Sequence, residues 1–150
     1  MTRLPGAVLF ACNLNRVRSP MAEGLMKRMF AGRVFVDSCG VRPGDDESAD
    51  PFMVAAMDEV GVDMSDHRRK TFADLDDESF DVVVSLTPEA HHRAVEMARS
   101  RAVEIEYWPI HDPTLVLGPR DAVVDAYRAI RHALEARIRE RFPLARTFGG

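Results

Sequence analysis

The sequence predicts a single-domain α/β fold of three layers, in which helices cover both faces of a parallel β-sheet. Strand and helix patterns alternate along the 150 residues, and repeated β-α units with short connections build sheets of this kind. Three of the predicted helices begin with a capping side chain followed by proline, which is typical of a helix N-terminus. We expect residues 1–150 to form one domain, because this length is ordinary for a single core.

The first β-α unit is predicted from an apolar run followed by a helix start. Residues 7–11 form the expected strand, and Ser19 and Pro20 are the expected N-cap and first residue of a helix. Gly32 is expected to end that helix, since glycine readily adopts the conformation found just after a helix. A short second strand is expected at 34–36, and it leads into the sequence D-S-C-G.

The middle of the chain is predicted to contain a helix, a buried strand and another helix. Asp50, which precedes a proline, is the expected N-cap of the second helix, and Gly61 is its expected end. The apolar run at 82–86 lacks polar alternation, which indicates a strand buried on both faces. Thr87, again followed by proline, is expected to cap a third helix that continues to about Ser100.

The last unit is predicted to contain an edge strand, a long loop and the longest helix. Residues 103–107 alternate apolar and acidic side chains, which favours a strand with one face in water. A loop at 108–119 follows this strand. Apolar residues at helical spacing then indicate a helix over 120–141.

The composition excludes several functional classes. The formal net charge is −4 and the isoelectric point about 5.7, so we expect no general affinity for nucleic acid or anionic membranes. No apolar stretch approaches the roughly 20 residues of a membrane span, and the first residues lack the apolar core of a signal peptide. Two cysteines do not make a disulfide framework. A cytoplasmic protein is therefore expected.

The strongest chemical signal is the sequence C-N-L-N-R-V-R-S-P-M-A-E, which begins at Cys12. A strand, a loop and a helix N-terminus together bind anions with backbone N–H groups and the helix dipole. Cys12 would lie beneath such an anion, and the guanidinium of Arg18 would grip two of its oxygens. The same positive field favours a thiolate. A thiolate beneath a bound phosphate is a nucleophile directed at phosphorus.

This C-x5-R-S-P-M-A-E sequence, after a hydrophobic strand, resembles the low-molecular-weight protein tyrosine phosphatases and the arsenate reductases that share their fold. The resemblance implies a four-stranded parallel sheet in the order 2-1-3-4, with the Cys12 loop where the strand order reverses. It also implies phosphoryl transfer through a cysteinyl phosphate. The expected phosphate-binding loop consists of Asn13, Leu14, Asn15, Arg16, Val17, Arg18 and Ser19.

Asp112, which precedes a proline in the predicted 108–119 loop, is the expected general acid. Transfer of phosphate to a thiolate expels an alkoxide or phenoxide, which needs a proton. The resulting carboxylate can then activate the water that hydrolyses the thiophosphate. The resemblance implies this role for an Asp-Pro pair in the late loop. The neighbouring His111 is expected to be a solvated loop residue.

Four further residues are expected to support the Cys12 loop. Asn15 tolerates a left-handed backbone conformation and can hydrogen-bond within the loop. The hydroxyl of Ser19 can donate to the Cys12 thiolate and make it a better leaving group. Ser38 and His67 match positions that brace the loop in the family that the sequence resembles, although His67 also fits an exposed place in a charged segment.

The sequence departs from the tyrosine phosphatase pattern at four positions. Leu14 stands where the family has glycine, and Val17 replaces a second loop cysteine, so the corresponding protective disulfide cannot form. Arg16 adds a positive charge at the rim of the loop. Thr114 stands where tyrosine usually flanks the substrate ring, which weakens the assignment to phosphotyrosine. Trp108 is a candidate replacement for that aromatic wall, although core packing is the simpler interpretation.

Two other functions are compatible with the sequence. Arsenate mimics phosphate, and the segment 108–113 (W-P-I-H-D-P) resembles the reductases more than the tyrosine phosphatases. Residues 82–90 lack the two cysteines of a thioredoxin-linked relay, which leaves reduction by an external thiol. The other hypothesis is a regulatory module that binds phosphate without turnover.

Cys39 and a histidine pair are the remaining reactive side chains. Cys39 follows the second predicted strand, so a reversible disulfide with Cys12 is compatible with the sequence if the two strands are adjacent. His91 and His92 are neighbours on a predicted helix and therefore point about 100° apart. We expect them to lie on a solvated helix face and not to bind a metal.

These observations together predict a phosphomonoesterase. Cys12 is the expected nucleophile, Arg18 the phosphate ligand, and Asp112 first the acid and then the base. No metal or organic cofactor is expected. The expected partner is a phosphorylated protein or a small phosphate ester, and the sequence indicates neither which of the two it is nor the oligomeric state.

Overall fold

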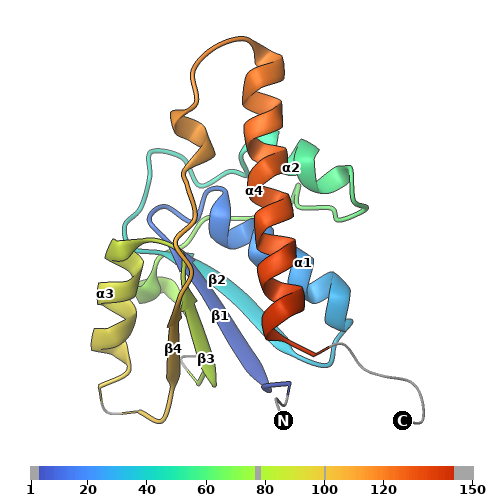
Figure 1. Cartoon of the computed structure of the whole chain (residues 1–150). Helices are drawn as coiled ribbons and strands as arrows, with labels where there is room; N and C mark the ends of the chain where they lie inside the picture. Colours follow the sequence, from blue (N-terminus) through green and yellow to red (C-terminus); the bar gives the residue numbers. More distant parts are fainter. Residues whose placement is uncertain (1–3, 77–78, 100, 144–150) are drawn as a thin grey trace, which may run out of the picture.

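The computed structural model describes residues 4–76, 79–99 and 101–143, and these contain a four-stranded parallel sheet (Figure 1). Its order is β2-β1-β3-β4, with every neighbouring pair parallel. This confirms the expected order 2-1-3-4 and places the first strand inside the sheet. The strands are β1 (Ala7–Cys12), β2 (Phe35–Gly40), β3 (Val82–Ser85) and β4 (Glu104–Tyr107).

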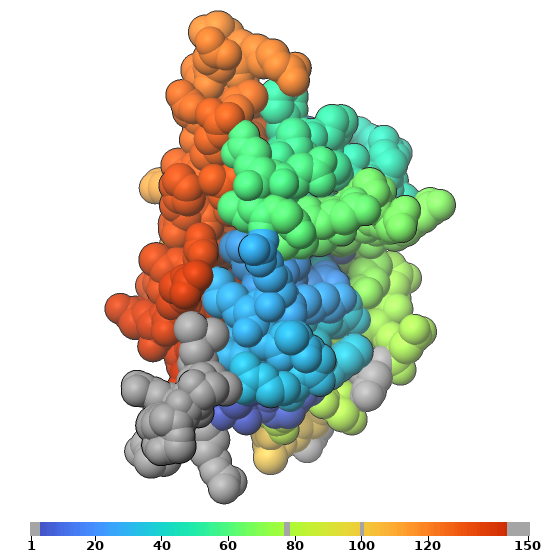
Figure 2. Space-filling model, turned by 90° about the vertical axis from the view of Figure 1, so that its right-hand side faces the viewer, coloured from blue at the N-terminus to red at the C-terminus, as the bar shows by residue number. Residues whose placement is uncertain are grey.

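Helices cover both faces of the sheet, which confirms the three-layer fold. One side carries α1 (Arg18–Phe30), α2 (Pro51–Asp58) and α4 (Arg120–Arg141), and Figure 2 shows their outer surface. The other side carries α3 (Pro88–Met97) and the short 3-10 helix η1 (Phe72–Asp74). A second 3-10 helix, η2 (Pro113–Leu115), precedes α4. None of the helices in the described parts of the chain combines the length and the apolar character that crossing a membrane requires.

β1 is buried on both faces because successive side chains of a strand point to opposite layers. Val8, Phe10 and Cys12 belong to the core beneath α1 and α4. Leu9 and Ala11 belong to the core beneath α3. Each of these five residues is at most 2% exposed, so packing from both sides fixes the end of the strand.

Two of the three predicted helix caps form. The Asp50 carboxylate accepts hydrogen bonds from the first N–H groups of α2, and the Thr87 hydroxyl accepts one from the first turn of α3. The prediction that Ser19 caps α1 was wrong. The helix begins at Arg18, before the predicted Pro20, and its N-cap residue Val17 makes no side-chain cap. The Ser19 side chain contacts Cys12 instead.

The other boundaries differ from the prediction by a few residues. The second strand starts one residue later and runs on to Gly40, because the D-S-C-G segment pairs with β1 as far as Cys12. α1 ends at Phe30 and α2 at Asp58, before the glycines expected to end them, and β3 and β4 are one residue shorter. The predicted end of α3, Ser100, lies outside the described residues. α4 has the predicted range.

Candidate active site

The Cys12 loop lies at the carboxyl end of β1, where the chain enters α1. β2 and β3 flank β1 on opposite sides, so this is the position at which the strand order reverses. Open α/β sheets bind their ligands at such positions. The first turn of α1 adds unpaired N–H groups at the same place, and these attract anions.

The Cys12 thiol is buried and hydrogen-bonded to Ser19. The sulfur and the serine Oγ are 3.0 Å apart, and Cys12 is 2% exposed. Ser19 Oγ also accepts a hydrogen bond from Asn15 Nδ2 at 2.8 Å, and its hydroxyl can donate to the carbonyl of Cys39 at 3.3 Å. A hydroxyl beside the sulfur is placed to stabilise a thiolate.

Asn15 holds the loop from within. Its φ is 55°, the left-handed conformation expected from the sequence, and the residue is fully buried. Its Nδ2 donates to Ser19 and to Ser38 at 2.8 and 2.9 Å, while its Oδ1 accepts from the backbone N–H of Lys70 at 3.0 Å. Because the amide is occupied on both sides by protein groups, the loop has its shape before a ligand binds.

His67 and Ser38 both contact this hydrogen-bond network. His67 Nε2 donates to the backbone carbonyl of Asn15 at 2.9 Å, since a carbonyl can only accept. Burial lowers the pKa of His67, although its hydrogen bond to Asn15 acts in the opposite direction. Ser38 accepts from Asn15 and donates to Glu23 at 2.5 Å. His67 therefore packs against the loop and does not take the exposed place that the sequence left open.

Gly40 and Glu23 also support the loop, and sequence reasoning missed both. A Cβ atom on Gly40 would lie 2.7 to 2.8 Å from backbone atoms of residues 13–15, so any side chain there would displace the loop. The available signal was a glycine at a strand end, which often marks a close backbone approach. Glu23 binds the hydroxyl of Ser38 and is the last residue of the S-P-M-A-E sequence.

Arg18 and Asp112 line the same pocket as Cys12. Arg18 Nη1 donates to the carbonyl of Ile110 at 3.0 Å, and Nη2 lies 3.7 Å from Asp112 Oδ2. Asp112 Oδ1 accepts hydrogen bonds from the backbone N–H and the hydroxyl of Thr114, at 2.9 and 2.6 Å. One carboxylate oxygen is thus held by its own turn, and the other lies beside Arg18.

Two further arginines line this pocket, and each is paired with a carboxylate. Arg16 binds the buried carboxylate of Asp50, and Arg42 binds Glu89 at 2.7 Å. The lining residues are Cys12, Asn13, Leu14, Arg16, Val17, Arg18, Arg42, Asp112 and Thr114. The predicted loop residues Asn15 and Ser19 are not among them, because both are fully buried behind the loop.

Trp108 and His111 do not take part in this pocket. Trp108 is 2% exposed and packs against Phe10 and Phe142 in the core. The idea that it replaces the missing aromatic wall was therefore wrong, and the core interpretation is confirmed. His111 is exposed, as expected for a solvated loop residue.

Cys39 lies on the opposite face of the sheet from Cys12. It is in register with Ala11, whereas Cys12 is in register with Gly40. Cys12 packs beneath α1 and α4, and Cys39 packs beneath α3. Both are free thiols, and burial raises the pKa of the Cys39 thiol. The suggested Cys12–Cys39 disulfide is incompatible with this arrangement, because the two side chains point apart.

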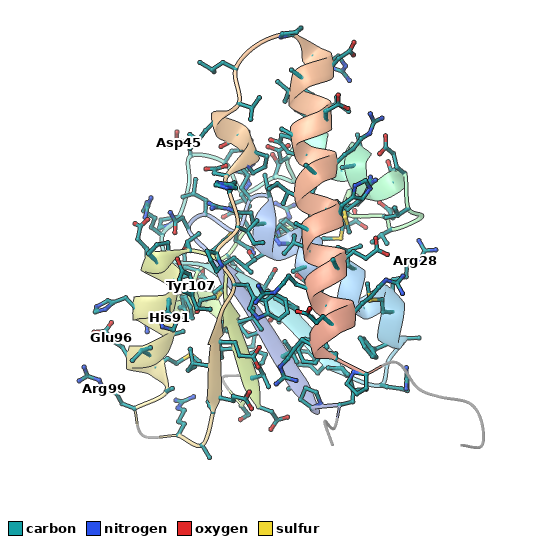
Figure 3. The ribbon with its side chains drawn as sticks, viewed as in Figure 1. Arg28, Asp45, His91, Glu96, Arg99 and Tyr107 are labelled. Atoms are coloured by element: carbon teal, nitrogen blue, oxygen red, sulfur yellow. The ribbon has the colours of Figure 1, made fainter. Side chains whose placement is uncertain are left out.

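The histidine pair on α3 is divided between two environments. The ring of His91 stacks on Tyr107 of β4, with centroids 5.1 Å apart (Figure 3). The His92 side chain is 81% exposed and lies 3.9 Å from Glu96. The expectation of a solvated face therefore holds for His92 only. Within the described residues there is no group of three or more His, Cys, Asp or Glu side chains that could hold a metal ion.

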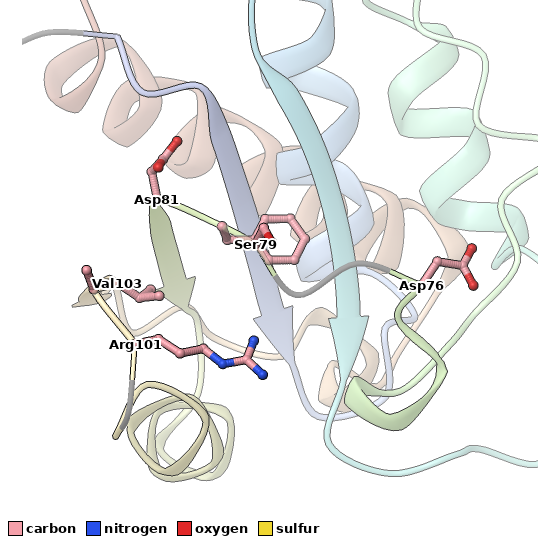
Figure 4. Close-up of a pocket in the computed structure, with 7 residues that line it drawn as sticks. Asp76, Ser79, Asp81, Arg101 and Val103 are labelled. Atoms are coloured by element: carbon pink, nitrogen blue, oxygen red, sulfur yellow. The ribbon is translucent and has the colours of Figure 1, made fainter.

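A wider hollow lies at the other end of the sheet, where β3 and β4 begin (Figure 4). Asp81, in its wall, accepts a hydrogen bond from the backbone N–H of Ala7 and so fixes the start of β1. Its described lining contains neither cysteine nor histidine: Asp76, Ser79, Phe80, Asp81, Arg101, Ala102 and Val103. The smaller Cys12 pocket is the one that combines a nucleophile with a cation and an acid.

Comparison with known proteins finds relatives that span most of this chain. A sequence model of the family described as "Low molecular weight phosphotyrosine protein phosphatase" matches residues 7–145. The glutaredoxin arsenate reductase of Synechocystis sp. is 29% identical over 131 residues, which are 87% of this chain and 92% of that protein.

Two solved structures share the fold under other names. The low molecular weight protein tyrosine phosphatase of T. tengcongensis has a TM-score of 0.72 at 25% identity, over 88% of this chain and 94% of that one. The arginine phosphatase YwlE, a Bacillus subtilis protein, has a TM-score of 0.70 at 26% identity, over 89% and 91%. Because the three relatives are named for three activities, likeness alone does not select a substrate.

Proposed function

Because the chain belongs to the low molecular weight phosphotyrosine protein phosphatase family, we propose that it hydrolyses phosphate monoesters through a cysteinyl-phosphate intermediate. One observation carries this proposal: Cys12, Arg18 and Asp112, from a strand end, a helix start and a late loop, line one pocket. They supply a nucleophile, a phosphate ligand and a proton donor. A phosphorylated protein or a small phosphate ester in the cytoplasm is the proposed substrate.

The proposed binding step uses groups that are already in position. The phosphoryl oxygens would accept hydrogen bonds from the backbone N–H groups of the loop and the first turn of α1. Arg18 would offer its planar fork, with Nη1 kept in place by the carbonyl of Ile110. Asp112 sits beside Arg18, where it would meet the leaving-group oxygen.

In the first chemical step the Cys12 thiolate attacks phosphorus. The P–S bond forms as the bond from phosphorus to the ester oxygen breaks, and the electron pair of that bond leaves on the oxygen. Asp112 gives its proton to this oxygen, so the product leaves as an alcohol or phenol. Arg18 and the loop N–H groups stabilise the charge that spreads over the equatorial oxygens.

In the second step a water molecule attacks the phosphorus of the cysteinyl phosphate. The Asp112 carboxylate takes a proton from the water, the P–S bond breaks, and Cys12 leaves as a thiolate. Ser19, 3.0 Å from the sulfur, donates to that thiolate and makes it a better leaving group. Phosphate is released, and Asp112 is again protonated for the next cycle.

Arsenate reduction is the second candidate, because a curated relative that covers most of the chain carries that name. The Cys12 thiolate would attack arsenate, so that an S–As bond forms as one As–O bond breaks and the oxygen leaves as water after protonation. An external thiol would then attack the Cys12 sulfur. That attack breaks the S–As bond, forms a mixed disulfide, and releases arsenite with the electron pair. Cys39 cannot act as the internal thiol, because it lies on the other face of the sheet.

A p-nitrophenyl phosphate assay tests the proposal against its alternatives. Hydrolysis without added thiol supports the phosphatase. Arsenite release that depends on glutathione or another external thiol, without ester hydrolysis, supports the reductase. Phosphate binding without either reaction supports the regulatory module and contradicts both enzymes.

Cys12→Ser gives the sharpest control for the covalent mechanism. The variant should fold and bind phosphate, because the loop N–H groups remain, but it should not turn over, because serine is not ionised at neutral pH. A mutant of YwlE is described with a phosphorylated active-site serine, so intact mass after incubation with substrate should be examined for a trapped phosphoserine. Hydrolysis at the rate of the unmodified protein would exclude a cysteinyl phosphate.

A further inference from the structure

Arg16 differs from the other arginines of the pocket because a buried carboxylate holds it in place. Its Nε donates to Asp50 Oδ2 at 2.5 Å, and Asp50 is fully buried. The same carboxylate accepts the first N–H groups of α2 and the hydroxyl of Tyr127, at 3.2 Å. Because its partner is buried and held by these other hydrogen bonds, Arg16 is anchored at the pocket rim through Nε.

The free edge of the Arg16 guanidinium is available to a ligand. Asp50 uses only Nε, and within the described parts of the chain the two terminal nitrogens have no hydrogen-bond partner. The side chain is 40% exposed and lines the pocket. Its two terminal nitrogens form a planar fork that matches the paired oxygens of a carboxylate or a phosphate.

The charges around the pocket favour a second anion on the substrate. Arg16 and Arg18 both line it, whereas Asp50 is shielded from solvent behind Arg16. Arg42 is a weaker candidate, because the exposed Glu89 already balances its charge. A ligand in the pocket therefore meets the Arg16 guanidinium before it meets the carboxylate that compensates it.

The lining contains no aromatic side chain among the described residues that could flank a plain phenyl ring. Thr114 borders the pocket, and Trp108 is enclosed in the core. The part of the substrate that carries the phosphate must therefore gain its binding energy from contacts other than aromatic stacking. The terminal nitrogens of Arg16 are the strongest polar group available for such a contact.

We propose that Arg16 selects phosphate monoesters that carry a second anionic group, either a carboxylate or another phosphate, close to the scissile phosphate. Arg18 holds the phosphoryl group, and Arg16 holds the second anion. This inference rests on the proposed function, because it assigns the substrate class of the same site. Two kinds of substrate share this chemistry: a small phosphate ester with an acidic group, and a phosphorylated residue next to an acidic residue of a protein.

Phosphonates test the inference without requiring turnover, because their P–C bond is not hydrolysed. Calorimetry would compare benzylphosphonate with its 2-, 3- and 4-carboxy derivatives, which place the second anion at different spacings. At least one carboxy isomer should bind the unmodified protein about tenfold more tightly than benzylphosphonate. That preference should weaken as salt is added.

Three variants separate recognition by Arg16 from a loss of folding. Arg16→Gln should bring the affinity ratio close to one. Arg16→Gln combined with Asp50→Asn should do the same without leaving an unpaired buried charge, since asparagine still caps a helix. Arg28→Gln, which removes an exposed arginine of α1 that does not line the Cys12 pocket (Figure 3), should keep the preference.

Equal binding of all four phosphonates by the unmodified protein would overturn the inference, as would a preference that survives in both Arg16 variants. These results are independent of the phosphatase proposal, whose failure would appear as absent p-nitrophenyl phosphate hydrolysis. Phosphotyrosine peptides with aspartate or alanine beside the phosphorylated residue distinguish a protein substrate from a small phosphate ester. A preference for the aspartate peptide that depends on Arg16 indicates a protein substrate, and a preference confined to the phosphonates indicates a small ester.

Discussion

The loop that carries Cys12 and the loop that carries Asp112 are built in opposite ways. Around Cys12, the buried residues Asn15 and Ser19 are tied to β2 and to the segment that contains His67. Around Asp112, the carboxylate is held by its own turn and by a 3.7 Å approach to Arg18. The comparison teaches that the proposed phosphate-binding loop is fixed by buried hydrogen bonds, whereas the proposed proton donor keeps more freedom to adjust to a leaving group.

The segment that follows Asp112 is also far more exposed than the Cys12 loop. Leu115 and Leu117 are 75% and 89% exposed, although both are apolar. Leu115 is the last residue of η2, and Leu117 lies in the connection between η2 and α4, which projects at the top of Figure 1. Side chains with so little packing contribute little to local stability, so this loop can move without disturbing the core.

Asp112→Asn tests the donor loop and should have the largest effect. With phenyl phosphate, whose leaving group needs a proton, formation of the cysteinyl phosphate should slow by about 10² to 10⁴-fold. With a dinitrophenyl ester the loss should be much smaller, because that phenolate departs unaided. Single-turnover kinetics with both esters give the comparison.

The affinity of Asp112→Asn for inorganic phosphate should stay close to that of the unmodified protein, because the Cys12 loop is untouched. An equal loss of rate on both esters would make Asp112 a structural residue. The proton donor would then have to be sought nearby, first at His111.

Arg18→Lys tests the phosphate side of the comparison. An ammonium cannot reproduce the planar two-point grip or the contact to the carbonyl of Ile110. We expect hydrolysis of p-nitrophenyl phosphate to fall by about 10² to 10³-fold. Activity within a factor of about three of the unmodified protein would contradict this role.

Gly40→Ala tests whether rigidity of the Cys12 loop matters. The added Cβ would collide with backbone atoms of residues 13–15, so the loop must shift. We expect the free energy of unfolding to fall by about 1 to 3 kcal/mol and phosphate affinity to weaken with it. Urea denaturation and phosphate titration measure the two effects.

Gly44→Ala is the matched control for this substitution. A Cβ atom there would lie 3.6 Å from Arg69 Nη1, which is an ordinary contact. It should change neither stability nor phosphate binding appreciably. If Gly40→Ala behaved like Gly44→Ala, the close packing of the loop on β2 would be unimportant.

His67→Gln should have the smallest effect, and the effect should depend on pH. Burial lowers the pKa of His67 in the folded protein below its ordinary value of 6.5, so the unfolded chain takes up a proton first as the pH falls. The free energy of unfolding therefore decreases as the pH falls through 6.5, and this decrease ends below the folded pKa. His67→Gln should flatten that slope.

Denaturation between about pH 5 and pH 8 measures the slope. His92→Gln, at an exposed position on α3, should leave the slope unchanged. Parallel curves for His67→Gln and the unmodified protein would show that the His67 contact to Asn15 does not couple protonation to folding.

The parts that could be predicted from sequence are those with local causes. Periodicity and capping residues indicated the sheet, its helices and the range of α4. The C-x5-R-S sequence brings Cys12 and Arg18 together because a strand end and a helix start are joined by one short loop. Asp112 needed the family resemblance, since its position depends on a chain segment a hundred residues away.

The parts that escaped prediction depend on register and on distant backbone. Cys39 points away from Cys12 because of a register that sets Ala11 beside Cys39, and a shift of one residue would reverse the faces. Gly40 must be glycine because the backbone of residues 13–15, from a separate segment of the chain, packs directly against its Cα. Ser19 has the chemistry of a helix cap, but the nearby Cys12 sulfur and Asn15 amide compete for its hydroxyl.

The position of Ser19 ties the direction of a single O–H bond to the charge on sulfur. Its oxygen accepts a hydrogen bond from Asn15, so its one proton is left for either Cys12 or the Cys39 carbonyl. A thiolate can only accept, and it draws the hydroxyl toward itself. In the proposed mechanism, once phosphorus occupied the sulfur, the hydroxyl would turn back to the carbonyl of Cys39 in β2. Each catalytic cycle would therefore rotate this hydroxyl out and back, and the amide signals of β2 would record which half of the cycle the sulfur is in.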